Sequence, residues 1–286
     1  MIRQPAVSGR FYPSNPKELR QLMDQCEASP IGVQERQIPF EGQLLGLIIP
    51  HAGFIFSGPV ATWAMRRLAG ETPLPKRLLL LGPKHTPYGA RASISAASAW
   101  RTPLGDVPVD QELRKALMDT GEFENENDAH AGEHSLEVQL PFLQKLYGDQ
   151  AFSVLPVALQ WSEFSDCHRW GKAISTVLVD ARFHGMPIII SSDFSHDTPR
   201  DRAYLIDNQA LDTIETLDAE AFFNLVRDED RSICGVIPIT TFLCSIKGRS
   251  GVRMRRLTYA TSMDVMPHPA GVGYAAVAFE QIFSKP

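Results

Sequence analysis

The sequence has few of the features that mark exported, membrane or nucleic-acid-binding proteins. Its 286 residues include only four cysteines and no C-x-x-C pair, so neither a disulfide scaffold nor a zinc ribbon is expected. No apolar run approaches the ~20 residues of a membrane span, and the first residues lack the apolar core of an export signal. The net charge of −5 has the wrong sign for a surface that neutralises phosphates. We therefore expect a cytoplasmic protein with free thiols and with neither a membrane nor a nucleic-acid partner.

Several catalytic motifs are also absent. The sequence has no G-x-S-x-G elbow, no G-x-G-x-x-G fingerprint and no P-loop, so serine hydrolysis and nucleotide use are not supported. The segment from His130 to His134 matches the inverted zinc-peptidase motif H-x-x-E-H, which needs both histidines on one helix. However, Gly132 interrupts it, and residues 122–133 are acidic, polar and without period, which is typical of an exposed loop. We expect His134 instead at the start of a helix capped by Ser135, pointing into a crevice as a hydrogen-bond donor.

Apolar β-rich runs alternate with helical patterns along the chain, without an internal repeat or a shift in composition. Hydrophobic residues make up 44% of the sequence, enough for a sizeable core. We expect a single α/β domain over residues 1–286, with a central, mainly parallel or mixed sheet flanked by helices. Strands are predicted at residues 44–49, 78–81, 152–157, 188–190 and 274–279, the last of them as a sheet edge. Helices are predicted at residues 16–26, 59–68, 111–119, 136–146, 163–180, 201–217, 219–227 and 238–247.

Three of the eight histidines follow predicted strands within a few residues. They are His51, His85 and His196. Because ligands of open α/β sheets bind at the carboxyl ends of the strands, these imidazoles converge if the three strands are parallel neighbours. Neutral imidazole is a common ligand of iron, copper and zinc. The sequence therefore predicts a metal site at this edge of the sheet, while the other histidines in polar contexts, His168, His184 and His268, are expected at the surface.

The residues leave the third metal ligand open between Asp193 and Cys234. Cys234 lies just before the helix that Pro238 is expected to start, and a thiol near a helix N-terminus has a lowered pKa and binds metals readily. The spacing Asp193-x-x-His196 suits acid–base chemistry, in which the carboxylate orients an imidazole that takes a proton from substrate. The same residues equally suit a turn in which Ser192 or Asp193 caps the following helix.

A set of short motifs in this order resembles the Memo family, the mediators of receptor-driven cell motility and their prokaryotic relatives. The motifs are A-V-S-G-R-F-Y-P (6–13), P-H-A-G (50–53), L-G-P-K-H (81–85), W-R-T-P-L-G (100–105), E-H-S-L-E (133–137), S-S-D-F-S-H (191–196) and I-C-G (233–235). The resemblance implies the fold of LigB-type class III extradiol dioxygenases, which are non-haem iron enzymes. It also implies that His51, His85 and Cys234 face the metal, that Asp193 and His196 lie beside them, and that His196 is the acid–base histidine.

The resemblance carries further expectations about cofactors and partners. Family members are linked to copper and iron chemistry and to binding of phosphorylated peptides, and prokaryotic ones, in the AmmeMemoRadiSam system, often accompany a radical-SAM protein and an AMMECR-type protein. The chain departs from the related patterns at two places. Cys234 stands where the dioxygenases have a carboxylate, and Val236-Ile237 replaces a usual Arg-His pair, which removes two polar groups from the expected pocket rim.

Three functions remain open from the sequence. The first is a metal-dependent, dioxygenase-like redox protein with iron or copper on His51, His85 and Cys234. In it, Asp193 orients His196 as general acid/base, and His134 donates a hydrogen bond to a bound oxygen species. The second is a zinc hydrolase on the same scaffold, with a metal-activated water. The third is a non-catalytic module that binds a small molecule or peptide.

Overall fold

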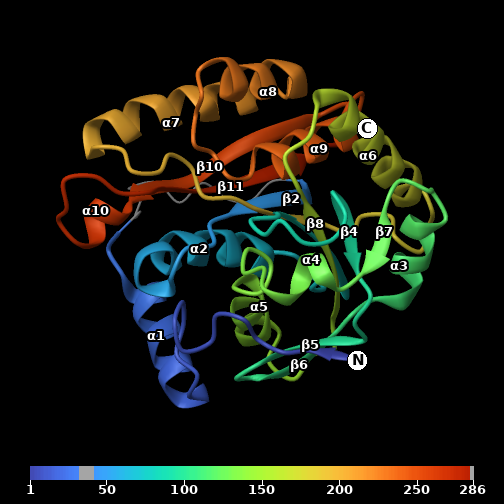
Figure 1. The fold of residues 1–286 in the computed structure, drawn as a ribbon, viewed down its shortest axis with the longest axis horizontal. Coiled ribbons are helices and arrows are strands. Elements are labelled where there is room, and N and C mark those ends of the chain that lie inside the picture. The colour runs from blue at the N-terminus through green and yellow to red at the C-terminus, as the bar shows by residue number, and fades with distance from the viewer. Residues whose placement is uncertain (32–41, 284–286) are drawn as a thin grey trace.

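A mixed eight-stranded sheet forms the centre of the computed structural model, which describes residues 1–31 and 42–283. Figure 1 shows helices α1, α2 and α5 on one side of this sheet and α6 to α9 on the other. The strand order is β10-β11-β2-β9-β3-β8-β4-β7, and a smaller sheet has the order β1-β5-β6. The strands are β1 (Ile2–Arg3), β2 (Gln43–Ile49), β3 (Arg77–Pro83), β4 (Ala92–Ser95), β5 (Ala99–Thr102), β6 (Gly105–Pro108), β7 (Glu124–Glu126), β8 (Ser153–Leu159), β9 (Ile188–Ser191), β10 (Val252–Thr261) and β11 (Gly273–Gln281).

The four central strands β2, β9, β3 and β8 are parallel neighbours. Nearly every residue of these strands is buried, because helices cover both faces of the sheet, and this explains their continuous apolar runs. The predicted α/β class and the predicted core strands are confirmed. The prediction of a sheet edge at residues 274–279 is wrong, because β11 lies between β10 and β2 and pairs with both.

The predicted helices are confirmed, with differences at three starts. The helices are α1 (Pro16–Ala28), α2 (Phe54–Ala69), α3 (Gln111–Met118), α4 (Asp128–Ala131), α5 (Gln139–Tyr147), α6 (Phe164–Leu178), α7 (Arg200–Glu215), α8 (Ala219–Asp228), α9 (Val236–Ile246) and α10 (Ser262–Val265). Helix α2 begins five residues before Pro59, and α9 begins two residues before Pro238. Helix α5 begins three residues later than predicted, because the Ser135 hydroxyl donates to the Pro83 carbonyl oxygen (2.8 Å) and caps no helix.

The prediction of an exposed loop at residues 122–133 is wrong in its centre, where β7 and α4 form. The carboxylate of Glu126 accepts hydrogen bonds from the backbone N–H groups of Asp128 (2.5 Å) and Ala129 (3.2 Å), and so orders the start of α4. His130, on this helix, is fully buried. Elements of three and four residues are too short to show the periodicity that the sequence analysis relies on.

A buried carboxylate ties the N-terminal segment to the body of the protein. Glu137 is fully buried and forms an ion pair with Arg3. It also accepts hydrogen bonds from the backbone N–H groups of Ala6 (2.7 Å) and Val7 (3.1 Å) and from the Tyr12 hydroxyl (2.5 Å). The first twelve residues are therefore held by one side chain 125 to 134 positions away along the chain.

No helix in the described part of the chain is long and apolar enough to cross a membrane. This agrees with the lack of long apolar runs in the sequence. The four cysteines are all unpaired, and Cys26, Cys167 and Cys244 are buried.

Gly46 of the central strand β2 is packed too closely for a side chain. A Cβ there would lie 2.6 Å from Phe242 Cε2 and 3.0 Å from the Ile188 carbonyl oxygen, and Phe242 is itself fully buried. We expect Gly46→Ala to lower the free energy of unfolding by about 1–3 kcal/mol through overpacking. Urea denaturation measures this, with Gly132→Ala as the matched control, because only Thr86 Cγ2, at 3.9 Å, approaches that position. Equal stability of the two variants would contradict the packing argument.

Candidate metal centre

The sheet topology brings the strand-end histidines together. In the order β2-β9-β3 the three strands are adjacent and parallel, so the segments that follow them start at one edge of the sheet. His51 follows β2 and His85 follows β3, and their ring centroids are 5.3 Å apart. The predicted convergence of these two imidazoles is confirmed.

Cys234 completes a three-atom donor cluster with the two histidines. One ligand atom each from His51, His85 and Cys234 all lie within 4.8 Å of one another, and Cys234 Sγ is 3.2 Å from His51 Nε2. The alternative third ligand, Asp193, is engaged elsewhere. Its Oδ1 accepts the backbone N–H of His51 at 2.7 Å, while its own backbone N–H donates to Cys234 Sγ at 3.2 Å. Of the two candidates from the sequence, Cys234 is thus the one in the cluster.

Glu133 orients His85, and the sequence analysis did not find this role. Its buried carboxylate accepts the His85 ring N–H at Nδ1 (2.9 Å) and the backbone N–H groups of His85 (2.5 Å), His134 (2.8 Å) and Ser135 (2.8 Å). Burial raises the pKa of Glu133, but the hydrogen bond from His85 and the other donors lower it to about 2. The ring of His85 therefore presents Nε2 to the cluster, as expected of a carboxylate–histidine pair behind a metal.

A second group of possible ligands consists of His85, Glu133 and His134. Glu133 Oε1 already accepts three N–H groups, so its lone pairs are committed to the protein. Oε2 accepts a fourth N–H group, from the His85 backbone. Because an ionised carboxylate has about four acceptor sites, Glu133 is a poor ligand and this second group is the weaker candidate.

Burial keeps His51 and Cys234 neutral. Burial, together with the neighbouring His85 and His134, lowers the pKa of His51 well below its usual value, so its ring is uncharged at neutral pH. Burial raises the pKa of the Cys234 thiol well above its usual value, followed by the negative charge of Asp193. The expectation of a lowered thiol pKa at the start of α9 is therefore wrong for the protein without metal, because desolvation outweighs the helix N-terminus. A metal ion would replace this proton on binding.

His196 is oriented by Ser232 and not by Asp193. Its Nδ1 lies 2.7 Å from the Ser232 carbonyl oxygen, and its backbone N–H donates to Ser232 Oγ at 2.8 Å. Because a carbonyl oxygen only accepts, Nδ1 carries the proton and the neutral ring has a free lone pair on Nε2. The predicted Asp193–His196 pair is thus replaced by a backbone contact. Burial raises the pKa of Asp193 to about 6.

His134 lies at the site, as the sequence predicts. Its ring stacks on His85 with centroids 4.7 Å apart and contacts the ring of Phe11 edge-on at 4.8 Å. Burial also lowers the pKa of His134. His130, the other histidine of the H-x-x-E-H sequence, lies on α4 and packs against Trp100. Helix α4 ends before Gly132, so the two histidines share no helix, and the zinc-peptidase interpretation does not apply.

Two further predictions, about the surface histidines and about a pocket rim at Val236 and Ile237, have opposite outcomes. His168, His184 and His268 are exposed, as predicted. Val236 and Ile237 do not line a pocket rim, because they are 1% and 2% exposed and begin the buried helix α9. Their apolar side chains belong to the core, so the loss of an Arg-His pair here says nothing about an exposed binding surface.

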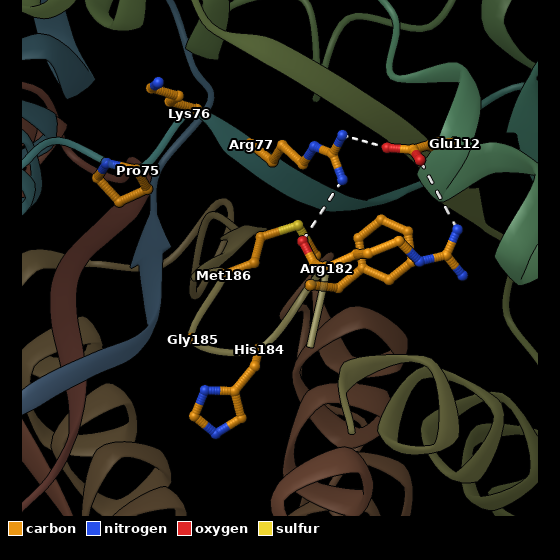
Figure 2. Close-up of a pocket in the computed structure, with 9 residues that line it drawn as sticks. Pro75, Lys76, Arg77, Glu112, Arg182, His184, Gly185 and Met186 are labelled. Carbon is orange, nitrogen blue, oxygen red and sulfur yellow. Dashed lines mark hydrogen bonds and ion pairs between the residues drawn. The ribbon is translucent and has the colours of Figure 1, made fainter. Parts of the chain in front are cut away.

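A cavity of about 470 Å³ near the amino end of β3 is lined by Lys76, Arg77, Glu112 and Arg182, and its arginines are paired with carboxylates. Figure 2 shows Glu112 between Arg77 and Arg182, and both arginines form ion pairs with it. Arg77 also pairs with Asp110 (3.1 Å), and Arg182 pairs with Asp180 (2.6 Å). The guanidinium charges of Arg77 and Arg182 are thus balanced by carboxylates. It lies at the opposite end of β3 from His85.

Comparison with known proteins identifies the family. A family model described as Memo-like protein matches residues 3–278. A MEMO1 family protein of Methanopyrus kandleri is 37% identical over 285 residues, covering 98% of this chain and 100% of the relative. A MEMO1 family protein of Pyrobaculum aerophilum is 36% identical over 283 residues, covering 97% of this chain and 99% of the relative.

A solved structure supports the fold. The crystal structure of an uncharacterised protein from Escherichia coli K12 matches with a TM-score of 0.56 at 12% sequence identity, covering 82% of this chain and 99% of that chain. At this identity the similarity shows the fold alone, and it is consistent with the LigB-type fold that the family resemblance implies. The family model and both relatives span nearly the whole sequence, and the chain therefore belongs to the Memo family.

Proposed function

We propose that this protein is a metal-dependent oxidoreductase with a non-haem iron or copper ion, related in chemistry to the dioxygenases. The observation that carries the proposal is the cluster of two imidazole nitrogens and one sulfur within 4.8 Å. Imidazole suits iron, copper and zinc, while a thiolate favours copper(I), zinc or iron over magnesium and calcium. The donor set thus fits a transition metal.

His51 and His85 would bind the ion through Nε2, and Cys234 through Sγ. Because His85 Nδ1 donates to Glu133, Nε2 is the ring nitrogen left to bind an ion. His51 Nε2 already faces Cys234 Sγ. Three protein ligands leave positions open for substrate. The bound ion would supply one-electron redox chemistry and activate dioxygen toward an electron-rich substrate.

The chain's own residues would handle protons around this centre. His196, held through Nδ1 by the Ser232 carbonyl oxygen, presents Nε2 as a base for a substrate hydroxyl proton. His134, beside His85, is placed to donate a hydrogen bond to bound substrate. Asp193 fixes the loop after β9 to the backbone of His51, and so holds His196 near the ligands.

The identity of the metal can be tested directly with protein purified without oxygen. Reconstitution with Fe²⁺, Cu⁺ or Zn²⁺, followed by desalting and elemental analysis, is expected to leave about one equivalent of iron or copper per chain. An oxygen electrode then measures oxygen uptake with a panel of catechols. Zinc binding with hydrolytic turnover and without oxygen uptake would favour a zinc hydrolase. Failure to retain any of the three ions would contradict the proposal and favour a module that binds a small molecule or peptide.

The expected partners, a radical-SAM protein and an AMMECR-type protein, remain part of this proposal. Co-purification of the three proteins from one cell extract, with and without reconstituted metal, measures whether the association depends on the ion.

A further inference from the structure

A buried hydrogen-bond network lies behind His51. Ser191, at the end of β9, and Gln139, at the start of α5, are both fully buried. His51 Nδ1 lies 2.8 Å from Ser191 Oγ. Ser191 Oγ also donates to the Ser135 carbonyl oxygen at 2.6 Å, and Gln139 Nε2 donates to Ser191 Oγ at 3.0 Å. This hydroxyl thus contacts three partners.

The count of donors and acceptors decides where the His51 proton lies. A serine hydroxyl has one proton to donate and two lone pairs to accept with. Its proton goes to Ser135, because a carbonyl oxygen only accepts, and one lone pair accepts from Gln139. The remaining lone pair faces His51, so His51 Nδ1 must donate to it.

The orientation of the Gln139 amide is fixed by a second contact. Gln139 Nε2 also donates to the Pro50 carbonyl oxygen at 3.1 Å. In the flipped orientation the amide oxygen would face this carbonyl oxygen and lose the contact. Gln139 therefore donates to both neighbours. It occupies one lone pair of Ser191 Oγ and leaves the other lone pair to accept from His51.

We infer that Ser191 and Gln139 are positioning residues that hold His51 in the Nδ1–H tautomer, so that its Nε2 lone pair points at Cys234 Sγ, 3.2 Å away. The inference rests on the proposed function only in treating Nε2 as a metal ligand. It differs from the arrangement at His85, where an ionised carboxylate does the same work. A neutral hydroxyl leaves His51 a less electron-rich ligand than His85, and it adds no negative charge next to the buried thiol.

Loss of the network should shift His51 toward its other tautomer. Neutral histidine in water favours the form with its proton on Nε2, the atom that must be free for a metal. Without Ser191 the ion would have to bind a ring that is no longer fixed, and loss of such an orienting partner weakens metal binding about 10–100-fold. We expect this loss for Ser191→Ala.

Two measurements test the inference. In ¹⁵N-histidine-labelled protein without metal, two-bond ¹H–¹⁵N correlation spectra report which ring nitrogen carries the proton, and the signals missing in His51→Ala assign His51. We expect the Nδ1–H form in the wild type and a shift toward the Nε2–H form in Ser191→Ala. Zn²⁺ affinity, measured by competition with a chromophoric chelator, is expected to fall about 10–100-fold in Ser191→Ala.

The matched control is Ser245→Ala, a buried serine on α9 whose hydroxyl donates to the Phe242 carbonyl oxygen within the same helix. It should leave the His51 tautomer and the Zn²⁺ affinity unchanged. A wild-type His51 protonated at Nε2 would overturn the inference, and so would an unchanged tautomer in Ser191→Ala. Because the tautomer is read without metal, a protein with the expected tautomer that binds no ion would contradict the proposed function while supporting this inference.

Discussion

Replacing His51, His85 or Cys234 with alanine is expected to reduce retained metal from about one equivalent to near zero. Each change leaves two of the three donor atoms that lie within 4.8 Å of one another. Loss of an orienting partner weakens metal binding about 10–100-fold. Loss of a direct ligand should weaken it further. Anaerobic reconstitution, desalting and elemental analysis measure the retained ion.

Two histidine variants serve as controls for this prediction. His168→Ala changes an exposed residue of α6 and should retain the full equivalent. His134→Ala should also retain it, because Glu133 is committed to N–H donors and the group of His85, Glu133 and His134 is the weaker candidate. Metal lost in His134→Ala but kept in Cys234→Ala would place the ion in that second group, and our choice of ligands would then be wrong.

Glu137→Ala is expected to lower the free energy of unfolding by about 3–5 kcal/mol, the cost of breaking a buried ion pair by removing one partner. The variant leaves Arg3, which is 6% exposed, without its buried carboxylate. It also leaves the Tyr12 hydroxyl and the backbone N–H groups of Ala6 and Val7 without the acceptor that they share. Equilibrium unfolding in urea measures the loss.

The control for this second prediction is a carboxylate in an exposed ion pair. Glu112 is 51% exposed and pairs with Arg77 and Arg182 at the surface cavity. An exposed ion pair of this kind adds at most about 1 kcal/mol to the free energy of unfolding. Glu112→Ala should therefore change the unfolding free energy far less than Glu137→Ala. Similar losses in the two variants would mean that burial of Glu137 adds nothing to the stability of the N-terminal segment.

The core strands and two residues of the candidate metal centre could be predicted because the relevant signals are local. A parallel strand buried on both faces is a continuous apolar run, and His51 and His85 follow such runs within a few residues. By contrast, β7 and α4 are too short to show a period. The contacts of Glu126 that order the start of α4 are local, at two and three positions, but they give no periodic signal.

The rest of the site depends on contacts between distant residues. The residues alone did not choose between Asp193 and Cys234, because the choice depends on a sulfur that approaches His51 from 183 positions away. The family resemblance supplied Cys234. The hydrogen-bond partners of the two histidines, Glu133 and Ser191, were missed because their hydrogen bonds to His85 and His51 join residues 48 and 140 positions apart.

The long separation between His51 and Cys234 has a consequence for biosynthesis. Protein chains emerge from the ribosome N-terminus first. His51 and His85 are therefore made well before Cys234. The strand that pairs with β2 on its other side, β11, comes last of all. A nascent chain thus has His51 and His85 without Cys234 while residues 86–233 are made, and the three candidate donor atoms can come together only after that segment has been synthesised.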